Sequence, residues 1–421
     1  MVDVNRRTLL TGGLALGGAA VLGACDRLEV PGGGRVPEAS AGAPPATTSA
    51  TTTTGPTGAT GTPSTTGNEA NDGSWRVSGP QPNQPIPTRL QRGDTPPQFV
   101  VVSWDGAGWT NEAPLLAHFR SVAAELKASM TLFLSGIYTV PKDQRTLYLP
   151  PGRAPGASAI PFFGPESVHG TIDNIGKAWL EGHEIGTHFN GHFCGSDGVA
   201  TWTVDQWKDE IAQAKKFVMT WRSTTGFTDL DPFPFDYRTE LVGGRTPCLD
   251  GSANLRTAAD QLGWRYDTSS TGNQVWPTKA GRLWALDMPS IPFVGHKGSV
   301  ISMDYNMMFN QSKTPDGDPA KRAQWQQEAV DSWMAGFTRA YDGNRAPYII
   351  GNHFENWNGG IYMAAVEQVM RKMATYPDTR FVSFRQLCDF LDAQDPTTLT
   401  RLRTLPIGVP PATGWPGFLT A

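Results

Sequence analysis

A run of apolar residues at positions 99–102 constrains the fold more than any other feature of the chain. The segment "QFVVVSWDG" carries β-branched and aromatic side chains in succession and stops abruptly at Asp105. This pattern is typical of a strand buried on both faces, as in a parallel sheet. Residues 113–128 then show apolar side chains at helical spacing, and residues 129–136 form a second buried run. The order strand, helix, strand predicts a wound α/β sheet or barrel.

The alternation of strands and helices continues along the chain. Further helices are predicted at residues 168–182, 203–221, 253–264 and 361–374, and further strands at residues 264–270 and 346–354. Thr203 and Gln206 predict a capping box at the start of the second of these helices. The Pro- and Gly-rich residues 138–168 predict a functional or capping loop.

Polar residues recur directly after the buried strands. They are Asp105, His188, Arg245, Asp267 and His353. In a parallel barrel the carboxyl ends of the strands share one edge, where the loops that carry chemistry gather. We therefore expect a functional site at that edge.

The first 75 residues differ in composition from the rest. Residues 1–25 contain Arg6-Arg7, an apolar run too short to span a bilayer, and a final "LGAC". They predict a twin-arginine lipoprotein signal ending at Cys25, with a plain secretory signal as the alternative. Residues 26–75 are rich in Gly, Pro, Thr and Ser and predict a disordered stalk. Residues 76–421 would form one α/β domain, exported and either lipid-anchored on the outer face of the cell membrane or secreted.

The charge balance limits the classes of molecule that the protein is expected to bind. Lys and Arg number 35 against 39 Asp and Glu, a net charge of -4, so no basic surface for nucleic acid is expected. Membrane contact is expected only through a lipid anchor at Cys25. The sequence leaves the oligomeric state open. Fourteen Trp and nineteen Phe suit a core and also platforms for sugar rings.

Three of the seven histidines lie in "GHEIGTHFNGHF". His188 and His192 are four residues apart, which in a helix or turn points both imidazoles the same way. This spacing suits two nitrogen donors to a divalent metal, although two histidines that are neighbours by chance are the plain alternative. His183 is expected to point elsewhere.

These segments resemble the motifs of the polysaccharide deacetylases (NodB homology, carbohydrate esterase family 4). "GHEIGTHFNGH" is similar to the second motif, "GGRTPC" to the Arg-x-Pro motif, "GWRYDTSS" to the Asp-bearing motif and "IIGNHF" to the late Leu-x-His motif. The motifs follow the family's order, and the resemblance spans about residues 97–393 and is nearest the chitin-deacetylase-like branch. It implies a distorted (β/α) barrel of the polysaccharide deacetylase type in a single domain.

The resemblance also implies a reaction and its residues. The protein would be a metal-dependent hydrolase that removes N-acetyl or O-acetyl groups from an acetylated polysaccharide or oligosaccharide. His188 and His192 would bind the divalent metal, with Zn²⁺ the expected ion. The implied catalytic set is Asp105 as base, His353 as acid, Arg245 as the holder of the base, and Asp267 as a residue that orients a partner.

The first motif departs from the family pattern, because "SWDGAG" holds one aspartate where the family has two. In the favoured alignment Asp105 is the base and Gly106 replaces a metal ligand. The rival alignment makes Asp105 the ligand and Trp104 the lost base, and it moves the strand side chains to the other face.

Three functional interpretations follow from this departure. The first is an active deacetylase with an altered site. The second is a catalytically impaired, deacetylase-like lipoprotein that binds glycan without cleaving it. The third is a purely structural wall lipoprotein, which would not need the polar residues that follow the strands.

Three cysteines lie beyond Cys25. Cys194 and Cys248 each follow one of the motifs, and we predict that they are bonded to each other. Cys388 lies at helical spacing with apolar neighbours, which predicts a buried free thiol.

Overall fold

The computed structural model describes residues 71–110 and 113–419. The predicted signal at residues 1–25, with Cys25, and residues 26–70 of the predicted stalk lie outside the described residues. Residues from 71 onward cluster as one unit, and at its start Ser74 is buried and Trp75 forms a parallel bridge with Phe233. Within the described residues, no helix has both the length and the apolar character needed to cross a bilayer.

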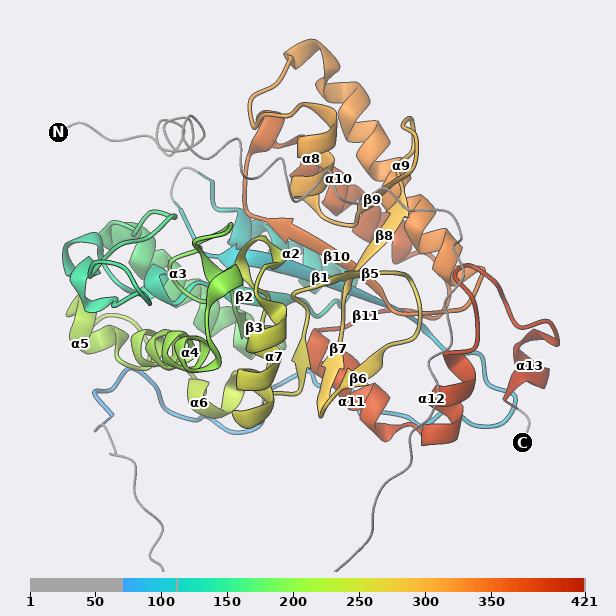
Figure 1. Ribbon diagram of the computed structural model, residues 1–421, viewed down its shortest axis with the longest axis horizontal. Coiled ribbons are helices and arrows are strands. Elements are labelled where there is room, and N and C mark those ends of the chain that lie inside the picture. Colours follow the sequence, from blue (N-terminus) through green and yellow to red (C-terminus); the bar gives the residue numbers. More distant parts are fainter. Residues whose placement is uncertain (1–70, 111–112, 420–421) are drawn as a thin grey trace, which may run out of the picture. The chain divides into compact units, whose positions relative to one another are not determined.

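Parallel strands form the centre of the domain, in the order β10-β1-β2-β3, with β11 beside the first residues of β1 (Figure 1). Their bounds are β1 Gln98–Ala107, β2 Thr131–Leu134, β3 Glu184–Thr187, β10 Tyr348–His353 and β11 Thr379–Phe381. Every residue of β1 is buried except Gly106, which is partly exposed. Burial on both faces explains the unbroken apolar run that opens the domain.

Short backbone links continue from this sheet and close a circuit. Arg245 N–H donates to the Thr187 carbonyl at 3.1 Å, and Thr268 N–H donates to the Gly244 carbonyl at 3.2 Å. Leu286 N–H then donates to Asp267, Ser302 N–H to Pro289, and Gly351 N–H in β10 to Ser302. The strands of this region are β4 Tyr266–Asp267, β5 Thr271–Gly272, β6 Thr278–Ala280, β7 Leu283–Ala285, β8 Met288–Pro292 and β9 Ser299–Ile301. The expected distorted (β/α) barrel is thereby confirmed.

Helices surround this barrel (Figure 1). They are α2 Leu115–Leu126, α3 Pro165–Leu180, α4 Val204–Met219, α5 Trp221–Thr225, α6 Tyr237–Glu240, α7 Ser252–Gln261, α8 Asp304–Gln311, α9 Arg322–Tyr341, α10 Trp357–Met373, α11 Phe384–Ala393, α12 Pro396–Leu402 and α13 Gly414–Phe418. The predicted helices match α2, α3, α4, α7 and α10, and the capping box of Thr203 and Gln206 is confirmed. Helices α8 and α9 were not predicted.

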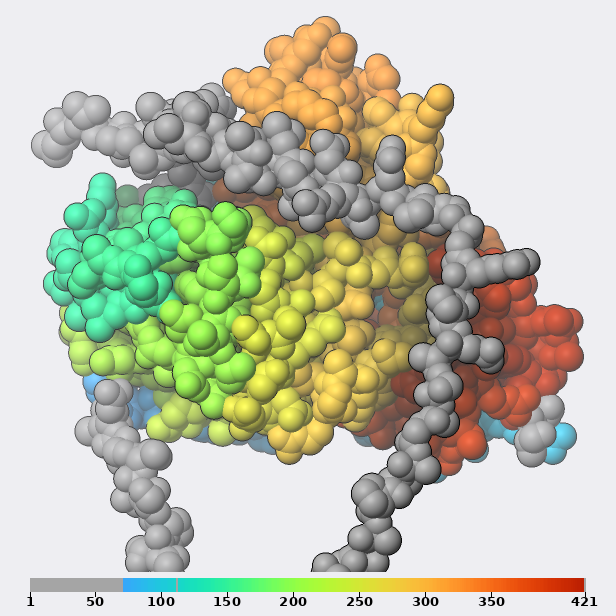
Figure 2. All heavy atoms as spheres, in the orientation of Figure 1, coloured from blue at the N-terminus to red at the C-terminus, as the bar shows by residue number. Residues whose placement is uncertain are grey.

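The predicted loop at residues 138–168 contains a 3-10 helix at Lys142–Leu147 and reaches α3 without a strand. It is attached to the histidine segment, because Ala159 N–H donates to the Gly191 carbonyl at 2.7 Å. Figure 2 shows this blue-green segment lying against the green segment that follows β3. The loop therefore forms one wall beside the carboxyl edge of the barrel.

Candidate active site

The carboxyl ends of β1 and β10 place two of the predicted residues side by side. In the parallel pairing of these strands, Asp105 is the register partner of His353. His188 directly follows β3, and Arg245 follows the short link that pairs with Thr187. Four residues that are far apart in the sequence therefore reach the same edge of the barrel.

Arg245 holds Asp105 in its charged form. Nη1 of this fully buried guanidinium donates to Asp105 Oδ1 at 2.8 Å and to Ser103 Oγ at 2.9 Å. Burial raises the pKa of Asp105, but the charge and hydrogen bond of Arg245, together with the nearby His188 and His353, bring the pKa below its usual value. The carboxylate is therefore ionised at neutral pH and able to accept a proton.

His353 is held in its protonated form by Asp304, a residue that the sequence analysis missed. His353 Nδ1 lies 2.8 Å from Asp304 Oδ1, and the His353 backbone N–H donates to Asp304 Oδ2 at 2.7 Å. Burial lowers the pKa of His353, but the charge and hydrogen bond of the buried Asp304 carboxylate, with smaller effects of Asp105 and Glu355, raise the pKa to about 9. The imidazole is therefore protonated on both nitrogens and positively charged at neutral pH. The available signal was the run "SVISMD", in which an aspartate follows β-branched residues as in "VVVSWD".

His188 presents an unused nitrogen to the site. Its Nδ1 lies 2.9 Å from the Arg245 carbonyl oxygen, which can only accept, so Nδ1 carries the proton and Nε2 holds a lone pair. Nε2 is buried and has no hydrogen-bond partner among the described residues. Burial lowers the pKa of His188 to about 4, so the ring is neutral. A neutral imidazole with a free Nε2 and a backbone-fixed Nδ1–H has the form of a metal ligand.

His192 lies beside His188, with the two ring centroids 5.0 Å apart. The segment between them is a loop and not a helix, since Phe189 and His192 have φ values of 60° and 53°. Burial lowers the pKa of His192 to about 3. Two neutral imidazoles at this separation fit a divalent metal. His183 is elsewhere, before β3, where its Nδ1 accepts from the Met130 N–H at 3.1 Å.

Glu210 of α4 fixes the loop between these histidines, and the sequence analysis missed it as well. The Asn190 N–H donates to Glu210 Oε1 at 3.0 Å, and the Tyr148 hydroxyl donates to the same carboxylate at 3.0 Å. Gly191 N–H in turn donates to the Tyr148 oxygen at 3.2 Å. Burial raises the pKa of Glu210 to about 7. This carboxylate is thus a positioning group behind the histidine pair.

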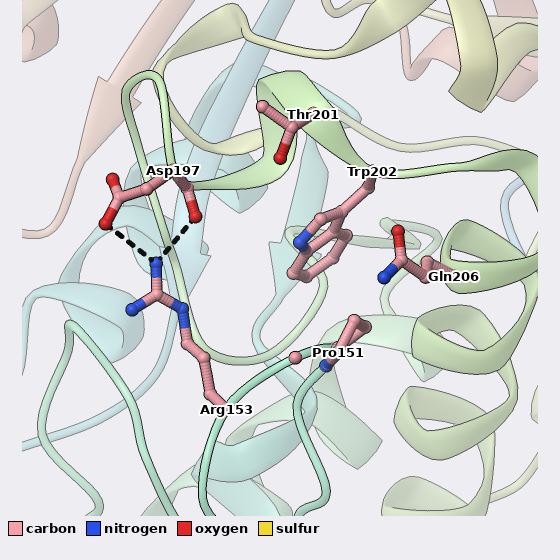
Figure 3. A pocket seen from close by; sticks show the side chains of 7 residues that line it. Pro151, Arg153, Asp197, Thr201, Trp202 and Gln206 are labelled. Carbon is pink, nitrogen blue, oxygen red and sulfur yellow. Dashed lines mark hydrogen bonds and ion pairs between the residues drawn. The ribbon is translucent and has the colours of Figure 1, made fainter.

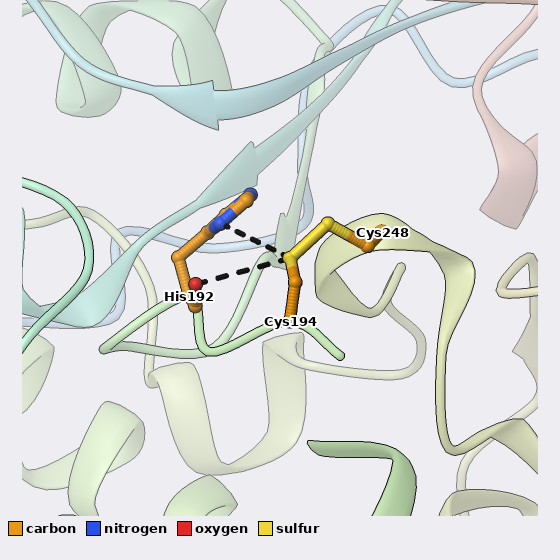
Figure 4. Close-up of side chains that lie close together, drawn as sticks. All are labelled: His192, Cys194 and Cys248. Atoms are coloured by element: carbon orange, nitrogen blue, oxygen red, sulfur yellow. Dashed lines mark hydrogen bonds between the residues drawn. A yellow bond between two sulfur atoms is a disulfide. The ribbon is translucent and has the colours of Figure 1, made fainter. Parts of the chain in front are cut away.

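The predicted disulfide between Cys194 and Cys248 is confirmed, and Cys388 is a buried free thiol as expected. The disulfide joins the loop that carries His192 to the segment that follows Arg245 (Figure 4). His192 Nδ1 lies 3.8 Å from Cys194 Sγ. These sulfurs are bonded to each other and offer no thiolate, so this cluster is not a second metal site.

Asp267 lies at the same edge but in a different pairing. Its Oδ2 accepts from Arg256 Nε at 2.7 Å, and Arg256 also binds Asp287 at 3.0 Å. Among the described residues, the carboxylate that contacts His353 is Asp304. Asp267 is the last residue of β4, and its ion-pair partner is Arg256.

The first motif has a specific geometry around Gly106. Gly106 adopts φ +61° at an irregularity in the pairing of β1 with β2, and it brings no carboxylate to the site. Trp104 is fully buried on the opposite face of the strand from Asp105, where it packs against Phe119 of α2 and stacks on Phe354. A side chain at position 104 therefore lies in the helix-covered core, away from Arg245.

Comparison with known proteins gave matches only among solved structures. No family model matches the chain, and no curated protein matches it. A protein from Mycobacterium smegmatis described as a polysaccharide deacetylase aligns with 74% of this chain and 94% of its own, at 13% identity and TM-score 0.43.

Two further structures have similar values. A protein from Pseudomonas aeruginosa described as a polysaccharide deacetylase aligns with 70% of this chain and 91% of its own, at 13% identity and TM-score 0.42. A variant of the peptidoglycan deacetylase PdaC from Bacillus subtilis aligns with 70% of this chain and 92% of its own, at 11% identity and TM-score 0.36.

Proposed function

We propose that this protein is a metal-dependent hydrolase of the polysaccharide deacetylase family that removes acetyl groups from a cell-surface or extracellular glycan. The observation that carries the proposal is the pairing of Asp105 with His353 on adjacent strands, beside the free Nε2 of His188. The environments of Asp105 and His353 shift their pKa values in opposite directions, one below its usual value and the other to about 9. A base and an acid set apart in this way are typical of hydrolytic sites.

His188 and His192 would hold a divalent metal, for which we propose Zn²⁺. Such an ion supplies a Lewis acid and lowers the pKa of water in its coordination sphere. Two histidines leave coordination positions open for water and substrate. Neither imidazole has to lose a proton before it binds a metal at neutral pH, since burial keeps both neutral.

The protein's own groups move the protons. Asp105, held by Arg245, accepts a proton from the attacking water. His353, held by Asp304, donates a proton to the leaving amine of the sugar, or to the leaving hydroxyl of an ester. The products are acetate and a deacetylated sugar. We also propose that the domain acts outside the cell, secreted or anchored through Cys25.

A second candidate function is glycan binding without cleavage. The observation that favours it is Gly106, which directly follows Asp105 and brings no carboxylate to the site. The two candidates differ in whether a bound acetylated glycan releases acetate.

Acetate release from N-acetylated oligosaccharides by the full chain separates the candidates. We expect turnover with added Zn²⁺ and a loss of about 10²- to 10⁴-fold in kcat for Asp105→Asn and for His353→Gln. The matched control is His118→Gln, which removes an exposed histidine paired with Glu367. Binding without acetate release by the wild-type chain would support the second candidate.

A further inference from the structure

A buried serine hydroxyl lies at the same edge of the barrel as the histidine pair. Ser135 directly follows β2, is fully buried, and its Oγ makes no hydrogen bond to any of the described residues. It precedes the short 3-10 helix Gly136–Thr139, where a serine usually accepts from a backbone N–H, but its side chain makes no such bond. An unsatisfied buried hydroxyl costs free energy, so Ser135 implies a partner from outside the described residues.

The pairing of the strands places Ser135 beside His188. Strand β2 pairs in parallel with β3, with Leu134 opposite Thr187, and the His188 N–H donates to the Leu134 carbonyl at 2.9 Å. The next pair of residues along the two strands is therefore Ser135 and His188, and side chains that lie opposite each other point to the same face of a sheet. His188 Nε2 is also buried without a partner among the described residues. One ligand between the two strand ends would satisfy both atoms.

Gly106 leaves room beside the Ser135 hydroxyl. A Cβ built on Gly106 would lie 3.9 Å from Ser135 Oγ and 3.8 Å from the Tyr138 hydroxyl oxygen, with no atom nearer than these apart from its chain neighbours. Gly106 directly follows Asp105 and is partly exposed, so solvent reaches this part of the edge. A position with room for a side chain, bordered by two hydroxyl groups, suits a water molecule.

We propose that Ser135 is a positioning residue of the metal site, which hydrogen-bonds a water molecule in the coordination sphere of the ion held by His188 and His192. A hydroxyl can donate and accept, so Ser135 can hold such a water without adding a charge. This inference rests on the proposed function and deepens it, because it names the group that acts where position 106 has no side chain. Groups that hold metal ligands through hydrogen bonds change metal affinity about 10- to 100-fold.

The test is the zinc affinity of the full chain, measured by competition with a chromophoric chelator. We expect Ser135→Ala to bind zinc about 10- to 100-fold more weakly than the wild type. The urea midpoint of the metal-free chain should not fall, because the variant removes a hydroxyl that has no partner among the described residues. A serine with a purely structural role would give the reverse, a lower midpoint with unchanged zinc affinity.

Two control variants have the opposite or no effect. Ser332→Ala removes a fully buried serine of α9 whose Oγ donates to the Glu328 carbonyl at 2.7 Å and accepts from the Val294 N–H at 2.9 Å. It should lower the urea midpoint and leave zinc affinity unchanged. Asp197→Ala removes an exposed carboxylate that pairs with Arg153 in the segment after the histidine loop (Figure 3). It should also leave zinc affinity unchanged.

A further variant, Gly106→Asp, tests the position beside Ser135. It adds a carboxylate there, and aspartate is among the residues that adopt the positive φ of Gly106 most readily. We expect Gly106→Asp to bind zinc more tightly than the wild type. Adding Ser135→Ala to Gly106→Asp should then cost less zinc affinity than Ser135→Ala costs in the wild type, because the two groups serve the same position.

The outcomes separate the role of Ser135 from the proposed function. Unchanged zinc affinity in Ser135→Ala, or the same loss with and without Gly106→Asp, would overturn the role of Ser135 and leave the histidine metal site in place. No zinc binding by the wild type would overturn both the role of Ser135 and the metal-dependent function. Weaker binding in Ser135→Ala alone among the three alanine variants would support the proposal.

Discussion

Asp304 shows how a single buried carboxylate can set the protonation state of the candidate acid. It accepts from both the backbone and the ring of His353, and it makes the largest contribution against the burial that lowers the pKa of the ring. Asp105, on the neighbouring strand, is kept ionised by Arg245. Each candidate proton-transfer group therefore has its own oppositely charged partner.

We predict that Asp304→Asn lowers the pKa of His353 from about 9, because the variant loses the largest of the charges that oppose burial and keeps only the smaller effects of Asp105 and Glu355. An acid works only while protonated, so kcat/KM should fall at lower pH in the variant than in the wild type. NMR titration of the His353 ring measures the pKa directly, and the pH profile of acetate release measures its consequence.

The control for this prediction is Asp267→Asn, which removes a buried carboxylate at the same edge that binds Arg256 instead. It should leave the His353 titration in place. An unchanged His353 pKa in the Asp304 variant would show that Asp304 does not hold the proton on the ring.

Sequence reasoning located strand-end residues better than it located their partners. A buried β-branched run followed by a polar residue identifies the edge of the barrel, and it did so for Asp105 and His353. It does not identify the side chain that contacts each of these residues. The sequence could therefore not show that Asp267 pairs with Arg256 and not with a histidine. The run before Asp304 carries the same signal more weakly, because its strand, Ser299–Ile301, has only three residues.

At the scale of elements, α4 and the loop after β3 form a unit through Glu210. The loop contains residues with positive φ. This backbone conformation costs free energy and persists where contacts with the surrounding structure stabilise it. The buried carboxylate bonds to Asn190 N–H and to Tyr148, which in turn accepts from Gly191. Helix α4 was predicted from its capping box and the helical spacing of its apolar residues. The role of Glu210 on its buried face can be seen only in the tertiary structure.

We predict that Glu210→Gln makes the folded domain less sensitive to pH between about 4.5 and 7. Burial raises the pKa of Glu210 to about 7, so the folded state binds this proton more tightly than the unfolded state. The wild type should therefore lose up to about 3 kcal/mol of stability as pH rises through that window, an effect that a neutral glutamine removes.

Urea unfolding of both chains at pH 5 and pH 8 measures this difference. The matched control is Glu328→Gln, a carboxyl on α9 whose pKa lies below its usual value. The same pH dependence in wild type and Glu210→Gln would contradict the account of this network.

Element prediction failed mainly between residues 271 and 341. Strands β5 to β9 have two to five residues each, so neither the apolar alternation nor the helical period can be read from them. Helix α9 is different, because Val330, Trp333 and Phe337 form a buried stripe at helical spacing that sequence inspection can detect. The missed part supplies Asp304 and closes the barrel, so its omission also left the acid without its partner.

At the scale of the whole domain, barrel closure explains why residues from five separate segments meet. The circuit returns from β8 through Ser302 to β10. The strand end that carries His353 therefore lies near the strand end that carries His188. The order of strands and helices was enough to predict a wound sheet with a functional site at its carboxyl edge. The geometry of closure depends on single bridges such as Met303 with Gly351, which leave no trace in the sequence.

We predict that His188 and His192 hold a metal ion although Gly106 supplies no ligand. The most direct measurement is the zinc content of the full chain, purified without chelator, incubated with excess zinc and desalted. The account predicts about one zinc per chain, lost when both histidines are replaced by alanine and kept in His118→Ala. No retained zinc in the wild type, or equal zinc in the double variant, would contradict it.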